Sequence, residues 1–135
     1  MNHPQTEQEN ATINREHAVQ IGMVDLLNQA ITEDRPDSEK VKILDQLIDY
    51  TDVHFMSEQL IMRQHSYEEF EAHDNDHDAL MERLKDLKQQ AQASALFNEN
   101  KALMELRGLL LSHIATYDRK LSTYLHSLQA THSPG

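Results

Sequence analysis

The sequence predicts an all-α protein that folds as an up-down-up-down four-helix bundle. Glycine and proline are rare, at 3 residues each of 135, whereas a turn-rich sheet protein needs many of both. Apolar residues recur three and four positions apart in four successive stretches, which is the period of an amphipathic helix. Short connections join these stretches and make neighbouring helices antiparallel. The length is typical of one domain.

The first helix is expected to begin near Ile13. Residues 1–11 are polar and show no periodicity, so we expect a flexible N-terminal arm there, followed by the bundle over residues 12–129. The apolar stripe of this helix consists of Val19, Met23, Leu26, Leu27 and Ile31. The helix is expected to end in the segment EDRPDS, residues 33–38, because Pro36 interrupts the pattern.

The second helix is expected to be long and to continue to about residue 64. Its apolar stripe consists of Val41, Leu44, Leu47, Ile48, Phe55 and Met62. Ser66 and Glu69 have the spacing of a capping box, which predicts a third helix over residues 67–92. The stripe of that helix consists of Phe70, His73, His77, Leu80, Leu84 and Leu87.

The fourth helix follows a connection that we expect within residues 93–100. Its stripe consists of Leu103, Leu106, Leu110, Ile114, Leu121 and Leu125. Residues 130–135, with the sequence ATHSPG, contain stop signals and are expected to be a linker or tail.

Composition restricts the classes of partner. A net charge of −11 disfavours nucleic acid, because the phosphate backbone would be repelled. The sequence contains no cysteine, which excludes disulfides, iron–sulfur clusters and thiolate zinc sites. No apolar run approaches the roughly 20 residues that span a bilayer, and no signal peptide is recognisable. We therefore expect a cytoplasmic protein without membrane partners.

The chain has nine histidines, and their positions indicate a buried metal site. Residues four apart lie on one face of a helix, and this spacing joins His54 to Glu58 and His73 to His77. His17 and His113 add one histidine each from the first and fourth helices. Burying five histidines without partners would cost several kcal/mol. A shared metal ion between the helices explains all of them.

These motifs resemble those of the hemerythrin and bacteriohemerythrin family over residues 13–128. The matching motifs are His17 in the first helix, HFMSE, HDNDH and HIATYD. The resemblance implies a metal centre of two iron ions, joined by an oxo or hydroxo bridge. The ligands it implies are His17, His54, Glu58, His73, His77, His113 and Asp118. Imidazole and carboxylate ligands also suit zinc or manganese, so iron follows from the resemblance alone.

The resemblance also assigns these ligands to the two irons. One iron takes His73, His77 and His113, and the other takes only His17 and His54, while both carboxylates bridge. The second iron therefore keeps an open position, at which the family binds dioxygen. Leu110 corresponds to a family position that lines the oxygen pocket, although it is equally explained as a core leucine.

Asp118 departs from simple helix geometry. It follows His113 by five residues, which on a regular helix places the two side chains roughly 140° apart. We hypothesise a local π-bulge or a tilted approach to a site two metals wide. Leu109 is a further departure, because the family often has tryptophan at this position.

Other polar residues are expected to face solvent. His65 and His126 match no family ligand and have polar neighbours. The run DNDHD, residues 74–78, is interpreted as a solvated acidic face except for His77.

The function implied by the resemblance is reversible dioxygen binding. Such bacterial domains are often fused to signalling outputs, so we expect an oxygen or redox sensor joined at its C-terminal end to an output domain, such as a diguanylate cyclase in c-di-GMP signalling. The alternative is a free-standing oxygen carrier or store. A peroxidase or nitric oxide reductase is a third reading, which we disfavour because the sequence shows no buried acid or base beyond the ligands. The domain itself is thus expected not to be an enzyme.

Overall fold

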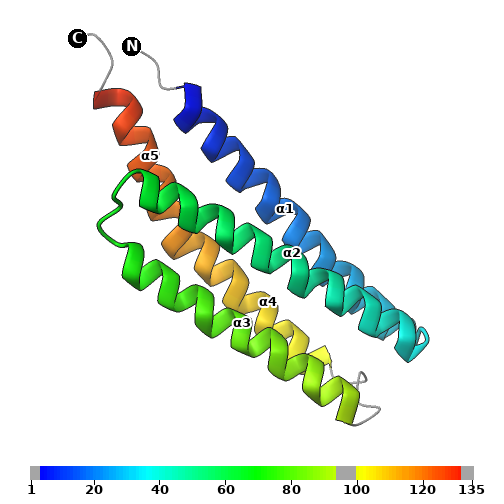
Figure 1. Cartoon of the computed structure of the whole chain (residues 1–135). Helices are drawn as coiled ribbons and strands as arrows, with labels where there is room; N and C mark the ends of the chain where they lie inside the picture. Colours follow the sequence, from blue (N-terminus) through cyan, green and yellow to red (C-terminus); the bar gives the residue numbers. More distant parts are fainter. Residues whose placement is uncertain (1–3, 94–99, 132–135) are drawn as a thin grey trace.

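The computed structural model describes residues 4–93 and 100–131, and every regular element in this part is helical (Figure 1). The first three helices are α1 (Pro4–Thr32), α2 (Asp37–Gln64) and α3 (Phe70–Ala93). The fourth is built from α4 (Asn100–His113), the π-helical segment η1 (Ile114–Asp118) and α5 (Arg119–Thr131). The prediction of an all-α helical bundle is confirmed.

Contacts between the helices show that α1 runs antiparallel to α2, and α3 to the fourth helix. Between α1 and α2, Glu9 pairs with His65 and Glu16 with His54, so residue numbers rise on one helix as they fall on the other. Between α3 and the fourth helix, Asp76 pairs with His113 and Glu69 with Lys120. Figure 1 shows the same course of the chain along the bundle.

The core has two apolar clusters separated by a polar layer. The larger cluster includes Val24, Leu27, Leu44, Leu47, Leu80, Leu84, Leu103, Leu106 and Leu110. The smaller cluster consists of Ile13, Ile61, Met62, Tyr67, Leu121 and Leu125. Since both clusters exclude water, the polar residues between them lie in an environment that stabilises only paired or metal-bound groups.

The expectation of an N-terminal arm is wrong for residues 4–11, because α1 already begins at Pro4. Thr6 and Asn10 are buried, and the Asn10 side chain donates to the carbonyl of Ser122 on α5 at 3.5 Å. Asn10 is held by this contact with another helix, which local periodicity does not report.

The predicted stripe of α1 is only partly correct. Val19 and Leu26 are 45% and 51% exposed. Val24, which the prediction omitted, is completely buried. The polar residue Gln20 is also buried, with 1% of its surface exposed. The buried face of α1 therefore includes a polar residue. Because the prediction considered apolar residues only, it placed the buried face of this helix incorrectly.

The connections also differ from the prediction. Ser66 has a positive φ of 51°, and α3 begins only at Phe70, so Ser66 is not the N-cap of that helix. Residues 94–99 of the expected third connection lie outside the described residues, as do residues 132–135 of the expected tail. Ala130 and Thr131 belong to α5. Across residues 4–93 and 100–131, no helix is both long and apolar enough to cross a membrane.

Candidate metal centre

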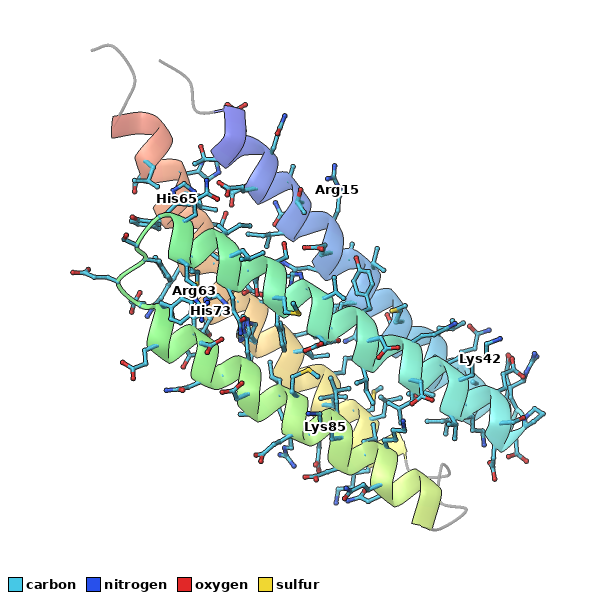
Figure 2. All side chains as sticks on the ribbon, in the orientation of Figure 1. Arg15, Lys42, Arg63, His65, His73 and Lys85 are labelled. Atoms are coloured by element: carbon cyan, nitrogen blue, oxygen red, sulfur yellow. The ribbon has the colours of Figure 1, made fainter. Side chains whose placement is uncertain are left out.

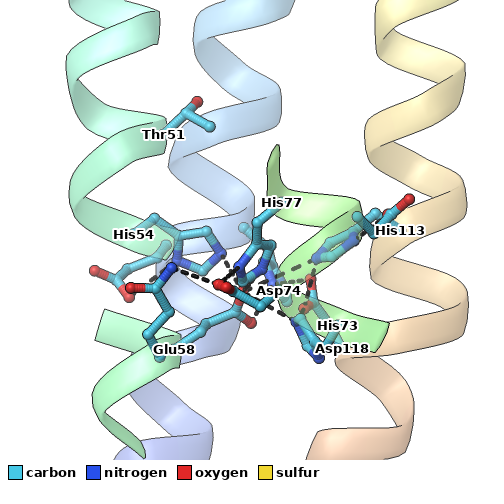
Figure 3. A network of polar contacts seen from close by, with 12 residues as sticks. Thr51, His54, Glu58, His73, Asp74, His77, His113 and Asp118 are labelled. Atoms are coloured by element: carbon cyan, nitrogen blue, oxygen red, sulfur yellow. Dashed lines mark hydrogen bonds and ion pairs between the residues drawn. The ribbon is translucent and has the colours of Figure 1, made fainter. Parts of the chain in front are cut away.

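The seven predicted ligand residues come together in the polar layer (Figure 3). They form two overlapping groups, within each of which the ligand atoms all lie within 4.8 Å of one another. One group consists of Glu58, His73, His77, His113 and Asp118, and the other of His17, His54, Glu58 and Asp118. The two carboxylates are common to both groups, as expected for bridging ligands.

The spacing of residues along α2 and α3 places two predicted ligands of each helix on the same helix face. His54 and Glu58 lie one turn apart on α2, and His73 and His77 one turn apart on α3. Because the side chains of residues four apart stack on one face, both pairs enter the bundle interior. His17 comes from α1 and is the predicted ligand that this helix contributes to the layer.

Asp118 reaches the site through η1. A π-helix closes i→i+5 hydrogen bonds, so it brings residues five apart onto one face. His113 immediately precedes this segment and Asp118 ends it. Asp118 is 2% exposed, and its Oδ1 lies 3.1 Å from His113 Nε2. The hypothesis of a local π-bulge is confirmed.

The two carboxylates occupy the middle of the cluster. Glu58 Oε1 lies 2.8 Å from His77 Nε2, 3.5 Å from His73 Nε2 and 3.7 Å from His54 Nε2. Asp118 Oδ2 lies 2.7 Å from His17 Nε2, and its Oδ1 lies 3.0 Å from His73 Nε2. Every Nε2 atom of the five histidines is therefore directed at the carboxylate pair.

Carboxylates outside the cluster orient two of the rings. His54 Nδ1 lies 3.1 Å from Glu16 Oε1, and His113 Nδ1 lies 2.6 Å from Asp76 Oδ2. When Nδ1–H donates outward to a carboxylate, Nε2 is left with its lone pair directed inward, as a metal ligand requires. The interpretation of DNDHD as a solvated face is thus wrong for Asp76.

The sequence contained a signal for these outer carboxylates. Glu16 and Asp76 each directly precede a predicted ligand, His17 and His77 respectively. Each of them nevertheless contacts a histidine of the neighbouring helix, because adjacent residues on a helix point about 100° apart. Sequence adjacency alone would have assigned each carboxylate to the wrong histidine.

Buried atoms without hydrogen-bond partners test whether a metal fits. Among the described residues, Nε2 of His17, His54 and His113 makes no hydrogen bond, and neither does either Asp118 oxygen. Their close contacts therefore lack hydrogen-bond alignment. Orphaned polar atoms are rare in interiors, and a set of them converging on one space matches the nitrogen and oxygen ligands that iron accepts. The residues present fit a metal centre.

Electrostatics in the protein without metal favours charged histidines. Burial opposes protonation of His17, but Asp118 and Glu58 outweigh it and raise the pKa of His17 to about 9. Burial likewise opposes protonation of His113, but the same carboxylates, with Asp76, raise the pKa of His113 to about 10. A cation in this space is thus strongly favoured, and protons take that role when metal is absent.

The pKa values of the other ionisable ligand residues are shifted in different directions. Burial lowers the pKa of His77, whereas Asp118 and Glu58 overcome the burial of His73 and raise its pKa. Burial would raise the pKa values of both carboxylates, but contacts with the histidines dominate and lower them. Both carboxylates are therefore ionised near neutral pH, as metal ligands must be.

Apolar side chains close the site on one side. Phe55 stacks on the His77 ring with centroids 3.9 Å apart and ring planes 10° apart. Leu110 is completely buried and belongs to the same core cluster as Phe55. The structure therefore places Leu110 in the apolar core next to the site.

The remaining histidines behave differently from one another. His126 is exposed, as predicted. The side chain of His65 is only 17% exposed, and its Nε2 lies 2.9 Å from Glu9 Oε1, so the prediction that it faces solvent is wrong. Figure 2 shows His65 at the end of α2 beside α1, away from His73.

Comparison with known proteins identifies the family. The model of the Hemerythrin HHE cation binding domain matches residues 9–125. The chain belongs to the hemerythrin family. A bacteriohemerythrin from Methylococcus capsulatus is 34% identical over 105 residues, which are 77% of this hemerythrin chain and 79% of the relative. No solved structure matches the chain.

Proposed function

We propose that this hemerythrin domain holds two iron ions, binds dioxygen reversibly at the ion next to His17 and His54, and serves as an oxygen or redox sensor. The observation that supports this proposal is the pair of ligand groups that share Glu58 and Asp118. A single metal would need only one such group. Two groups with common carboxylates are what a bridged pair of metals requires.

The unequal nitrogen count supports ligand binding at one position. His73, His77 and His113 would supply three nitrogens to one ion, whereas His17 and His54 would supply two to the other. The ion with fewer protein ligands keeps an open coordination position. Iron would supply the electrons that reversible dioxygen binding uses.

The residues of the chain would hold the ions and limit the access of water. The site lies between two apolar clusters, and Phe55 and Leu110 cover the layer around His77 and His113. Neither of these side chains can donate or accept a proton, whereas turnover of peroxide needs a proton donor. On the side of His17 and His54, the buried polar residues Gln20 and Thr51 carry an amide and a hydroxyl group, which are not acids near neutral pH. These surroundings favour reversible binding over catalysis.

The sensing role rests on the position of Asp118. This bridging carboxylate ends η1, and α5 continues directly from it to Thr131. A change in the site could therefore alter the direction of α5 and reach a C-terminal output domain. Such an output must distinguish the states of the site, since equal affinity for all states would shift no equilibrium.

A free-standing carrier is the second candidate. The match covers 79% of the bacteriohemerythrin relative, which leaves that protein no room for a further domain of ordinary size. The relative is thus about one domain long. The two roles differ only in whether another domain responds to the site.

Iron content and the visible spectrum of the purified protein test the proposal together. We expect nearly two irons per chain and a charge-transfer band that disappears on reduction and returns with oxygen. A variant with Glu58→Ala should retain the helical circular dichroism spectrum but lose the band. One iron or none per wild-type chain, or a band that does not respond to oxygen, would refute the proposed function.

A further inference from the structure

Two buried polar side chains lie beside the metal centre without belonging to it. Gln20 on α1 is 1% exposed and Thr51 on α2 is completely buried. Gln20 Nε2 donates a hydrogen bond to Thr51 Oγ1 at 3.0 Å. Neither residue belongs to a ligand group. A buried hydrogen bond adds little net stability compared with apolar packing, so stability alone does not account for the pair.

The pair lies one helical turn from the ligands of the nitrogen-poor position. Gln20 follows His17 by three residues, and Thr51 precedes His54 by three. Because α1 and α2 run antiparallel, both residues lie on the same side of the histidine layer. Figure 3 shows Thr51 one turn from His54 on α2, on the side away from Glu58.

The other half of this layer is apolar. Leu80 follows His77 by three residues on α3, and Leu110 precedes His113 by three on α4, and both are buried. The two leucines thus lie next to the position that has three histidines. Among the described residues one helical turn from the histidines on this side, the polar pair Gln20 and Thr51 lies beside the position that has two.

On the opposite side of the centre, Ile13, Met62 and Leu121 are apolar and pack in one cluster with Tyr67. The Tyr67 hydroxyl interacts electrostatically with Asp118, which both ligand groups share. Gln20 and Thr51, in contrast, lie on the two helices that carry His17 and His54, where coordination is incomplete. This coincidence indicates a role toward a ligand bound there.

We propose that Gln20, oriented by Thr51, donates a hydrogen bond to a small ligand bound at the metal position of His17 and His54. The side-chain nitrogen of glutamine has two N–H donors. One is used by Thr51, and the other is directed to the ligand. The recognised class is a small acceptor that bears negative charge when bound to metal, such as azide. The inference rests on the proposed function because it needs a metal there.

The two residues have different roles. Gln20 touches the ligand, whereas Thr51 is a positioning residue that fixes the carboxamide. Thr51→Ser keeps the accepting oxygen, and Thr51→Val removes it while preserving the shape. Gln20→Met removes the donor at similar length and volume. Gln29→Met makes the same change at an exposed position of the same helix.

The experiment measures the azide dissociation constant by visible titration of diferric or cobalt(II)-substituted protein, together with metal content. Gln20→Met and Thr51→Val should weaken azide binding roughly threefold to tenfold, which is the effect of one hydrogen bond. Metal content should stay unchanged. Thr51→Ser and Gln29→Met should bind azide like the wild type.

Other outcomes would overturn the inference. They are azide binding by Gln20→Met within a factor of about two of the wild type, or loss of metal by that variant, since Gln20 would then hold the metal rather than the ligand. A wild-type protein that takes up no metal would refute this inference and the proposed function together. Azide binding that depends on Gln20, in a protein that shows no reversible oxygen band, would refute only the proposed function.

Discussion

At the scale of single residues, the orientation of the histidine rings directs their Nε2 atoms to the place where a metal would bind. A histidine can present either nitrogen to a metal, and the hydrogen bond made by the other nitrogen decides which. Glu16 and Asp76 make this choice for His54 and His113. Neither carboxylate is a ligand, and both lie on a different helix from the ring that they hold.

Replacing one of these carboxylates should weaken metal binding without preventing folding. Asp76→Asn removes the charge that orients His113, and outer contacts of this kind typically contribute a factor of roughly 10 to 100 in metal affinity. We expect a loss in that range, measured by competition with a chelator of known affinity. Asp78→Asn is the matched control, because Asp78 is exposed on the same helix. Equal affinities of the two variants would contradict the role of Asp76.

At the scale of the element, the π-helical segment η1 brings two residues that are five positions apart onto one face of the fourth helix. A regular helix would place His113 and Asp118 on different faces, and the π-turn brings them together. A π-bulge amounts to one residue inserted into an α-helix. The core positions before and after it, including Leu110 and Leu121, remain buried, so the insertion changes the spacing only within the site.

Deleting Thr116 should therefore be tolerated by the fold. Thr116 is exposed within η1, and its removal leaves a regular helix with Asp118 four residues after His113 in place of five. We expect cooperative thermal unfolding of the metal-free variant, and metal binding should persist, because residues four apart on a regular helix still lie on one face.

The control for this prediction is deletion of Gly108, which is exposed within the regular helix α4. That deletion rotates every residue on one side of it by about 100° and moves core leucines toward solvent. It should lower the unfolding temperature strongly. If deletion of Thr116 were as destabilising as deletion of Gly108, the description of η1 as a local insertion would be wrong.

At the scale of the whole molecule, protons and metal compete for the centre of the bundle. The pKa values of His17 and His113 are raised to about 9 and about 10 from 6.5. Their protonation stabilises the metal-free fold fully below pH 6.5, and this contribution is lost as pH rises through the folded-state values. The lowered pKa values of Glu58 and Asp118 stabilise it above their ordinary range, and that contribution is lost on acidification.

The metal-free protein should accordingly become less stable between about pH 6 and about pH 9. Metal binding needs neutral histidines, so metal affinity should rise over the same interval. Thermal unfolding of metal-free and loaded protein at both pH values measures the two effects. The stabilisation by metal should be larger at the higher pH. A metal-free protein whose stability rises with pH would contradict the assigned pKa directions.

Loss of metal is also expected at a higher pH than the ordinary pKa of histidine suggests. An unperturbed histidine near 6.5 predicts release of iron below about pH 5 to 6. The raised pKa values of His17 and His113 mean that protons already compete near neutral pH. Iron retention after dialysis at stepwise lower pH would show where the competition begins.

The sequence by itself determined the helical class and predicted which residues meet in the polar layer. Period-three and period-four patterns act within one helix, so Leu44 and Leu47 on α2, and the pair His73 and His77 on α3, were recognisable without a partner. The five-residue spacing to Asp118 left a π-bulge or a tilted approach open, and the structure shows the π-turn.

Tertiary structure alone decided the features that depend on a second helix. Packing against α5 extends α1 back to Pro4, and the antiparallel register brings Asp76 to His113 and Gln20 to Thr51. Burial of a polar side chain depends on its partner, and partners such as Gln20 and Thr51 are 31 residues apart in the chain. The physical reason is that local periodicity encodes which face of a helix is buried, whereas the neighbour that meets that face is fixed only by the packing of the bundle.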